Sequence, residues 1–332
     1  TKSLPGTKDY KNFWYRERDR CLLGYEPIVD GEPCGIKITG EHYFYLNYSR
    51  IGRVVFNEIT GEASERLDFP MFCSMDYYWY KVLQECENPE NVLDKAHLIA
   101  TKARRKGFSF KNSSGAVWKY SFFPESKIVI ASEYGQKAKQ TFDMCLDTID
   151  FLNEHTEFRS PWTHRKSAAT KCYIRAGIEV EKGGRKYVKG KKSSIQTISL
   201  HNKPDAAAGL AATRVIFEEA GQIKNLKEAW AYTEPTLRSG AYLKGIAIVF
   251  GTGGENDGAA RDFSDMFYDP ARYKFKSFRN IYEEAENNSQ CGWFIDDMWF
   301  REGTEITIDN KKYKALDENG NAWKWVAELD LN

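Results

Sequence analysis

Short apolar runs that end in polar or glycine residues are the feature of this sequence that most limits its possible fold. Three of them, Lys127–Ser132, Thr213–Phe217 and Lys244–Phe250, are rich in Ile, Val, Ala and Phe. Near-continuous apolar runs of this length are typical of strands buried on both faces of a parallel sheet. Segments of helical length follow or separate them, and we expect helices over residues 109–120, 135–155 and 226–239. This alternation predicts an α/β fold with a mostly parallel sheet and right-handed crossovers.

A fourth apolar run, residues 95–101, leads into the basic loop Lys102–Lys106 and then into Gly107-Phe108-Ser109. Strand, loop, glycine and hydroxyl is the layout of a phosphate-binding loop, in which backbone N–H groups bind phosphate and the hydroxyl binds Mg²⁺. The usual spacing places Lys102 in the first glycine position and Phe108 in the lysine position. The pattern therefore indicates either an altered phosphate-binding loop or an ordinary strand followed by a solvated, basic helix start.

Two acids, Glu218 and Glu219, follow the run Thr213–Phe217 directly. An apolar strand that ends in two acids is typical of a Mg²⁺-binding acid beside a catalytic acid. The first carboxylate would orient the hydrated metal, and the second would polarise the attacking water. The alternative interpretation is a helix start, where the helix dipole favours acids.

The run Lys244–Phe250 ends in Gly251-Thr252-Gly253-Gly254. The Thr252 hydroxyl is a candidate for hydrogen bonding to the γ-phosphate or the catalytic water, and the alternative is a plain glycine turn. In an open parallel sheet, ligands bind beyond the carboxyl ends of the strands. We therefore expect the basic loop, the acid pair and Thr252 to meet at one site.

These segments together resemble the large terminase subunit of tailed double-stranded DNA bacteriophages. The resemblance spans about residues 15–325 and depends on three motifs in order, with Gly40–Asn47 near the start: Lys102-x-x-x-x-Gly107-Phe108-Ser109, Val215–Glu219 and Phe250–Gly254. In that family the lysine of the phosphate loop stands at the front, as Lys102 does here. The resemblance implies an additional-strand P-loop ATPase with a mostly parallel central sheet flanked by helices, an N-terminal β extension and a C-terminal lid.

The resemblance also implies residue roles, with ATP and Mg²⁺ as cofactors. The nucleotide would be bound by Lys102, Ala103, Arg104, Arg105, Lys106, Gly107, Phe108, Ser109, Thr252 and Gly253. The metal would be bound by Ser109 and Glu218, where Glu replaces the usual Asp. The catalytic group would comprise Glu219, Lys102, Arg104 and Arg105. The position of the arginine finger is open among Arg104, Arg105, Arg214 and Arg238.

The function implied is that of an ATP-driven motor that translocates double-stranded DNA into a procapsid through the portal. Its partners would be DNA, the portal protein, the small terminase subunit and further copies in a pentameric ring, with the isolated chain a monomer. It would work in the host cytoplasm and at the portal vertex. We expect an extension over 1–60, the ATPase core over 61–255, a lid over 256–332 and no nuclease domain. The alternatives are a related DNA helicase or translocase, and an inactive nucleotide-binding scaffold.

A second basic segment forms a predicted hairpin. Residues 171–180 and 185–189 are joined by Lys182-Gly183-Gly184, which is a turn signal. The cations that we assign as DNA contacts are Arg185, Lys186, Lys189, Lys191 and Lys192. They either bind the DNA backbone or lie on a solvated hairpin.

Three local predictions concern the remaining chain. We expect a strand over His42–Tyr48, a helix over Phe69–Cys86 and a mobile loop over 203–212. Another helix is expected over 323–329. Five residues near the start of the predicted helix Phe69–Cys86 either contact adenine or belong to the core: Phe69, Pro70, Phe72, Asp76 and Tyr77.

Composition limits the class of protein. The net charge of +1 over 332 residues means that any DNA contact must be local. The seven cysteines include no C-x-x-C pair, so we expect free thiols and no zinc site. No apolar run reaches the length of a membrane span, and no signal peptide is recognisable, so we expect an intracellular protein without a membrane contact.

Overall fold

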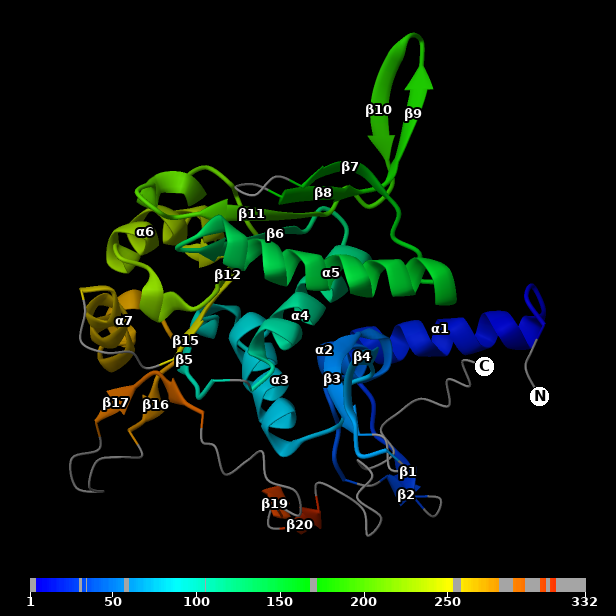
Figure 1. The fold of residues 1–332 in the computed structure, drawn as a ribbon, viewed down its shortest axis with the longest axis horizontal. Helices are drawn as coiled ribbons and strands as arrows, with labels where there is room; N and C mark the ends of the chain where they lie inside the picture. The colour runs from blue at the N-terminus through cyan, green and yellow to red at the C-terminus, as the bar shows by residue number, and fades with distance from the viewer. Residues whose placement is uncertain are drawn as a thin grey trace. The chain divides into compact units, whose positions relative to one another are not determined.

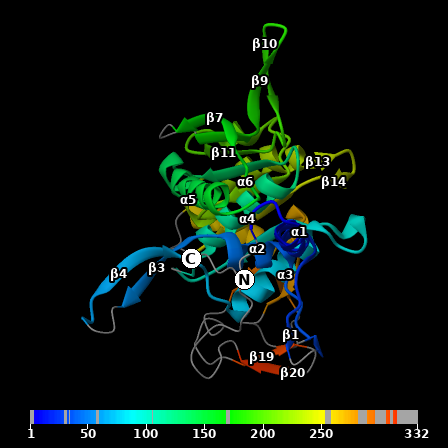
Figure 2. The ribbon, with the colours of Figure 1, turned by 90° about the vertical axis from the view of Figure 1, so that its right-hand side faces the viewer.

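The structure is a computed structural model with two compact units (Figures 1 and 2). It describes residues 4–29, 32–33, 35–56, 60–104, 106–167, 172–252, 258–280, 289–295, 305–308 and 311–314. Unit 1 comprises residues 1–81, 146–159 and 298–332, and unit 2 comprises residues 82–145 and 160–297. The domain boundaries at residues 60 and 255 remain a prediction.

Unit 2 contains an eight-stranded sheet in the order β18-β5-β15-β12-β6-β11-β8-β7. Its strands are β5 (Leu98–Thr101), β6 (Lys127–Ser132), β7 (Trp162–Ser167), β8 (Cys172–Ala176), β11 (Ser194–Ser199), β12 (Arg214–Phe217), β15 (Ile246–Gly251) and β18 (Trp293–Phe294). Every neighbouring pair from β18 to β11 is parallel, whereas β8 and β7 are antiparallel. The predicted α/β class and mostly parallel sheet are thereby confirmed.

Strand β15 lies between β5 and β12, which determines where the site forms. Gly251 pairs with Thr101 of β5, and Val249 pairs with Phe217 of β12. The three strands therefore run in the same direction and end at the same edge of the sheet. Whatever follows each strand is brought next to the other two.

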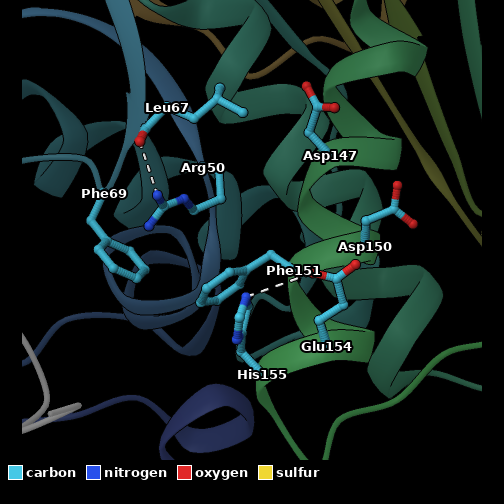
Figure 3. Close-up of a pocket in the computed structure, with 8 residues that line it drawn as sticks. All are labelled: Arg50, Leu67, Phe69, Asp147, Asp150, Phe151, Glu154 and His155. Atoms are coloured by element: carbon cyan, nitrogen blue, oxygen red, sulfur yellow. Dashed lines mark hydrogen bonds and ion pairs between the residues drawn. The ribbon is translucent and has the colours of Figure 1, made fainter. Parts of the chain in front are cut away.

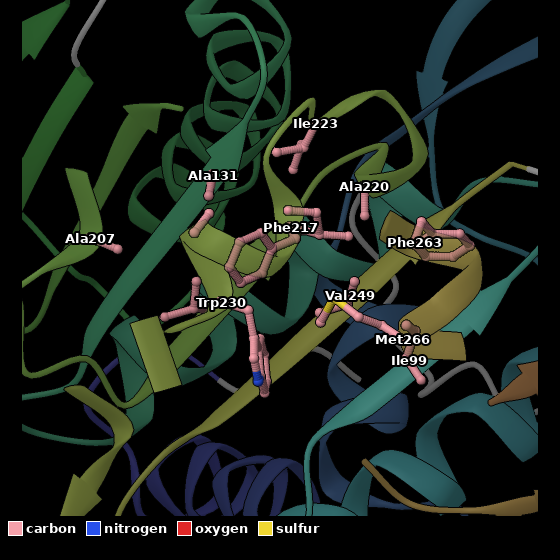
Figure 4. Packing of buried hydrophobic residues seen from close by; sticks show 14 of the residues in the cluster. Ile99, Ala131, Ala207, Phe217, Ala220, Ile223, Trp230, Val249, Phe263 and Met266 are labelled. Atoms are coloured by element: carbon pink, nitrogen blue, oxygen red, sulfur yellow. The ribbon is translucent and has the colours of Figure 1, made fainter. Parts of the chain in front are cut away.

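Helices cover both faces of this sheet. They are α4 (Phe108–Phe122), α6 (Leu226–Thr233), α7 (Gly258–Tyr268) and the first part of α5 (Gly135–His155). On one face, the side chains of Phe217 and Val249 pack with Trp230 of α6 and Met266 of α7 in one buried cluster (Figure 4). On the other face, the ring of Phe108 in α4 lies 6.1 Å from that of Phe250. Burial on both faces explains why these strands have no alternating pattern in the sequence.

The small residues over 203–212, which we expect to form a mobile loop, include a regular element. Pro204–Ala207 forms a short 3₁₀ helix, and Ala207 and Ala212 are buried in the cluster shown in Figure 4. Small side chains here allow the backbone to pass close to the core.

Unit 1 contains helices as well as β hairpins. Its elements are α1 (Lys8–Leu23), α2 (Gly40–Tyr48), β1 (Ile28–Val29) with β2 (Glu32–Pro33), and β3 (Ile51–Phe56) with β4 (Ala63–Asp68). Glu17 of α1 is fully buried and accepts hydrogen bonds of 2.7 Å from the hydroxyls of Tyr43 and Tyr48. The predicted β extension is therefore a mixed α and β segment.

The strand predicted over His42–Tyr48 is wrong, because these residues belong to helix α2. Thr39 caps the helix by accepting the N–H of His42, and every residue from Gly40 to Tyr48 is buried. A segment buried on all sides carries no periodicity, so the sequence pattern does not distinguish helix from strand. Gly40 lies so close to α1 that a Cβ atom would sit 2.4 Å from the Cys21 carbonyl oxygen.

Two other predicted helices differ in outcome. Helix α3 (Ser74–Glu87) begins later than the predicted Phe69, in agreement with Pro70, which disfavours helical geometry in the residue before it. The helix predicted over 323–329 lies outside the described residues.

The structure also describes four short strand pairs: β9 (Ile178–Lys182) with β10 (Arg185–Lys189), β13 (Arg238–Ser239) with β14 (Tyr242–Leu243), β16 (Phe278–Arg279) with β17 (Gln290–Cys291), and β19 (Glu305–Ile308) with β20 (Lys311–Lys314). Over the described residues, no helix is both long and apolar enough to cross a membrane.

A buried ion cluster ties the amino end of β12 to helix α3. Arg214 is fully buried and donates to Glu87 Oε1 at 2.9 Å from Nε, while Lys119 Nζ lies 2.9 Å from Glu87 Oε2. Burial would raise the pKa of Glu87, but Arg214 and Lys119 outweigh it, so the pKa is lowered. Removing the carboxylate would leave two buried cations without this partner.

We predict that Glu87→Gln lowers the free energy of unfolding by about 3 kcal/mol, because it removes the charge that compensates buried Arg214. Glu85 is the matched control, since it lies on the same helix but is half-exposed and contacts Lys276 at 3.2 Å. Glu85→Gln should cost less than about 0.5 kcal/mol. Urea denaturation monitored by tryptophan fluorescence measures both, and equal losses would contradict the prediction.

Candidate functional site

Three segments far apart in the sequence meet at the carboxyl edge of the sheet. Lys102 Nζ, after β5, donates to Glu219 Oε1 at 2.7 Å and to Thr252 Oγ1 at 3.4 Å. The Thr252 hydroxyl in turn donates to Glu219 Oε2 at 3.4 Å. The Lys102 side chain is only 6% exposed, so this ion pair is largely shielded from water. The structure thus brings the predicted loop, acid pair and threonine together.

Two glycines permit this close approach. A Cβ atom on Gly251 would lie 2.9 Å from the Gly221 nitrogen, and one on Gly221 would lie 3.0 Å from the Thr252 carbonyl oxygen. Larger residues at either position would push the end of β15 away from the loop that follows Glu219. The Lys102 N–H also donates to the Gly251 carbonyl at 3.0 Å, which fixes the start of the basic loop.

Glu219 has an unusual backbone conformation. Its φ of 50° and ψ of 54° lie in the left-handed region, which costs a residue with a side chain roughly 1–2 kcal/mol. The turn separates the two acids, since Glu219 contacts Lys102 whereas Glu218 contacts Ser109. Strained residues of this kind are concentrated at functional sites.

Glu218 and Ser109 form the second contact of the site. The Ser109 hydroxyl donates a short hydrogen bond to Glu218 Oε1, and Glu218 is only 4% exposed. Burial raises the pKa of Glu218 to about 7; the Ser109 hydrogen bond opposes this shift, and the charge of Glu219 adds to it. Among the described residues, Oε2 has no hydrogen bond of ordinary geometry, although the Thr141 hydroxyl is close enough to lower the pKa. A cation beside this buried oxygen would stabilise the charged form of the carboxylate.

The start of helix α4 presents backbone donors to the same region. Gly107 caps the helix in a left-handed conformation with φ of 69°, and the first intrahelical bond runs from the Lys111 N–H to the Gly107 carbonyl. The N–H groups of Ser109 and Phe110 precede that bond at the amino end of the helix. They lie at the positive end of the helix dipole, which favours anions.

Phe108 occupies the position where a phosphate loop usually has its lysine, and it belongs to the core. Its side chain is 2% exposed and packs against Phe250. The cation of the site is instead Lys102, whose Nζ also lies 5.8 Å from the centre of the Phe250 ring. The geometry agrees with a lysine at the front of the loop.

A cavity of about 290 Å³ opens beside these groups. It is lined by Lys102, Arg104, Lys137, Glu219, Gln222 and Thr252. Sequence reasoning missed Lys137 and Gln222, which hydrogen bond to each other. Lys137 could have been found from the sequence, because it follows strand β6 at the same edge of the sheet as the other ends. Arg104 is exposed, whereas Arg105 and Gly253 lie outside the described residues.

Glu133 is a further residue that the sequence did not single out. It is buried at the end of β6, and its Oε2 accepts the N–H of Lys224 at 3.1 Å. Its Oε1 lies 2.9 Å from His201 Nδ1. Glu133 therefore supports the loop that carries Glu219 from the side opposite Thr252.

Two of the proposed arginines lie away from this site. Arg214 begins β12 and is held by Glu87, and Arg238 hydrogen bonds to Glu234 and to the Ala241 carbonyl before β15 begins. Arg214 is at the amino end of β12, whose carboxyl end forms the site, and Arg238 lies on β13, eight residues before β15. Among the candidate arginines that the structure describes, Arg104 is the one that lines the cavity.

The proposed adenine contacts lie in unit 1. Phe69 lines a cavity of about 450 Å³ in which the Arg50 guanidinium lies 4.5 Å from its ring and the Phe151 ring lies 5.5 Å away (Figure 3). Phe72 stacks on His42 with ring centres 5.5 Å apart. These contacts favour a packing role for the two rings, and the adenine assignment, with Pro70, Asp76 and Tyr77, stays a prediction.

Comparisons with known proteins found partial structural similarity to phage large terminases, with TM-scores from 0.34 to 0.42. No family model and no curated protein sequence matches the chain. The large terminase ATPase domain of Thermus phage P74-26 is similar, with a TM-score of 0.42 and 19% identity over 65% of this chain and 82% of that one. The large terminase of bacteriophage HK97 has a TM-score of 0.41 and 13% identity over 74% of this chain and 44% of that one. The large terminase of a thermophilic bacteriophage, in complex with ATP-gamma-S, has a TM-score of 0.34 and 14% identity over 54% of this chain and 38% of that one.

We predict that glycine at position 219 destabilises the protein less than alanine does. Glu219→Gly and Glu219→Ala remove the same carboxylate, but only glycine adopts φ of 50° without steric cost. The glycine variant should be more stable than the alanine variant by about 1 kcal/mol, and both should be inactive. Urea denaturation of the two variants measures the difference, and an alanine variant of equal or greater stability would show that the position is unstrained.

Proposed function

We propose that unit 2 hydrolyses ATP at the carboxyl edge of its sheet. The observation that supports this most strongly is the contact of Lys102 with Glu219 and Thr252, directly beside the pair formed by Ser109 and Glu218. A cation, a carboxylate exposed to a cavity, a buried carboxylate with a hydroxyl, and the N–H groups at the start of a helix are the components of phosphoryl transfer to water.

Ser109 and Glu218 are suited to hold Mg²⁺. Both offer oxygen ligands, which this ion prefers, and Glu218 has a buried oxygen without a hydrogen bond of ordinary geometry. Within the described residues no group of three or more His, Cys, Asp or Glu side chains is assembled, so the remaining ligands would be water and phosphate oxygens. When bound, the ion supplies charge neutralisation to the phosphates.

The protein groups would then have distinct tasks. The N–H groups at the start of α4 and the Lys102 ammonium bind phosphate oxygens. Glu219, 24% exposed and facing the cavity, accepts a hydrogen bond from the attacking water and orients it. Lys102 forms an ion pair with Glu219 in this structure. A phosphate that binds Lys102 breaks this pair, and the Glu219 carboxylate can then accept a hydrogen bond from water. Thr252 contacts both groups and so is placed to respond to the exchange.

Arg104 is our candidate for stabilising the charge that develops on the transferred phosphate. It lines the cavity, is exposed, and can act within the subunit or on a neighbour. Arg105 keeps the same assignment as an expectation from the sequence. Ala103 and Lys106 would contribute backbone to the loop.

The motif resemblance extends the proposal to a DNA-packaging motor. In that role the ATPase would drive double-stranded DNA into a procapsid through the portal protein, with the small terminase subunit as a further partner. The active form would be a pentameric ring at the portal vertex in the host cytoplasm, and the isolated chain would be a monomer. Nuclease activity is not part of the proposal for these residues.

The direct test is ATP hydrolysis by Glu219→Gln. We expect kcat to fall at least 100-fold, because an amide cannot act as the base, while binding of Mg²⁺-ATP changes by less than about threefold. Glu228→Gln is the control, since Glu228 is an exposed acid on α6 and should leave both quantities unchanged. Turnover in Glu219→Gln equal to that of the unaltered chain would refute the assignment. Nucleotide binding without any turnover in the unaltered chain would favour the inactive scaffold.

A further inference from the structure

The hairpin β9–β10 is a projecting arm of unit 2. It extends beyond the sheet next to β7 and β8 in both views (Figures 1 and 2). Gly183 and Gly184 at its tip have φ of 61° and 73°, as a type I′ turn requires. At its base, a Cβ atom on Gly177 would lie 2.6 Å from the Lys189 carbonyl oxygen, so the two strands cross there at close range. Gly177 is also where the single strand expected over 171–180 divides into β8 and β9.

Pairing in this hairpin sorts its side chains onto two faces. Successive residues of a strand point to opposite faces, and residues directly opposite each other share one. Val180 pairs with Tyr187, and Lys182 pairs with Arg185. The first face therefore carries Ile178, Val180, Lys182, Arg185, Tyr187 and Lys189. The second face carries Glu179, Glu181, Lys186 and Val188.

The two faces differ in charge. The first face has three cations, Lys182, Arg185 and Lys189, and no acid. The second face has two glutamates and one lysine, and Lys186 Nζ lies 3.7 Å from Glu179 Oε1. The cations of the first face are therefore available to an external anion, whereas Lys186 is compensated by its own face.

Exposed rings and aliphatic groups lie among the cations of the first face. Tyr187 is 46% exposed and Ile178 is 53% exposed. Tyrosine hydroxyls donate to phosphate, and aromatic and aliphatic groups contact sugars and bases. The first face therefore offers contacts to sugars and bases as well as to phosphates.

We propose that the first face of the β9–β10 hairpin binds the phosphate backbone of double-stranded DNA. Arg185 and Lys189 are four residues apart on one strand, about 13 Å, which matches roughly four base pairs of axial rise. A two-stranded ribbon also fits the major groove. The inference deepens the motor function proposed above, since it names the surface that would hold the polymer. It retains Arg185 and Lys189 from the sequence prediction, adds Lys182, and leaves out three cations: Lys186, Lys191, which donates to Ser160, and Lys192, which lies beyond the hairpin.

The test compares two triple variants that each remove three positive charges from the same segment. One is Lys182→Gln/Arg185→Gln/Lys189→Gln, and the control is Lys186→Gln/Lys191→Gln/Lys192→Gln. Binding to a short labelled duplex is measured by fluorescence anisotropy over a salt series. The first variant should lower the slope of log K against log[salt] by about 2.7, which is 0.9 for each lost phosphate contact. The control should change it by less than about one.

Equal slopes for the two variants, or salt-independent binding by the unaltered chain, would overturn the proposal. The proposal would also be overturned if the first variant lost binding to a single strand of the same length but kept its binding to the duplex. Thermal melting verifies that both variants fold, as expected for exposed positions. ATP hydrolysis without DNA is measured on the same samples, so that failure of the proposed ATPase is seen separately from failure of the hairpin surface.

Discussion

The ion pair between Lys102 and Glu219 is the contact on which the rest of the site depends. It joins the end of β5 to the end of β12 across β15, and a distance of 2.7 Å with a nearly buried ammonium makes it strong. It exists because Gly251 and Gly221 let two backbones approach closely and because Glu219 accepts a left-handed conformation. The proposed catalytic acid, Glu219, is thus held at the cavity by the same cation that would bind phosphate.

The two adjacent acids are in different electrostatic environments, although they follow the same strand. Glu218 is buried beside Ser109, and its burial raises its pKa to about 7, whereas Glu219 faces the cavity and an ammonium group. In the proposed mechanism this difference would suit Glu218 to a metal ion and Glu219 to the attacking water. Glu133 on β6 and Thr252 on β15 support the intervening loop from its two sides.

Much of this arrangement can be predicted from the sequence, and there are physical reasons why the rest cannot. Parallel strands end at one edge, so the meeting of Lys102, Glu219 and Thr252 was predictable from three apolar runs. Helix α2 was not predictable, because a segment buried on all sides has no periodicity. The division of the hairpin into a cationic face and a compensated face depends on which residues pair, and a one-residue change of register would reverse it. Lys137 could have been predicted in the same way because it follows β6, whereas Gln222 joins the cavity only through the fold of the loop after Glu219.

The central claim is that Lys102, at the front of the loop, is the lysine that binds phosphate. The most direct measurement is the affinity of a fluorescent ATP analogue with Mg²⁺ for Lys102→Met and Lys106→Met. Both variants remove one lysine from the same loop, but only Lys102 contacts Glu219 and Thr252. We predict at least a tenfold loss of affinity for Lys102→Met, corresponding to about 1.4 kcal/mol, and less than a threefold loss for Lys106→Met. Unchanged affinity in Lys102→Met, or a larger loss in Lys106→Met, would contradict the account.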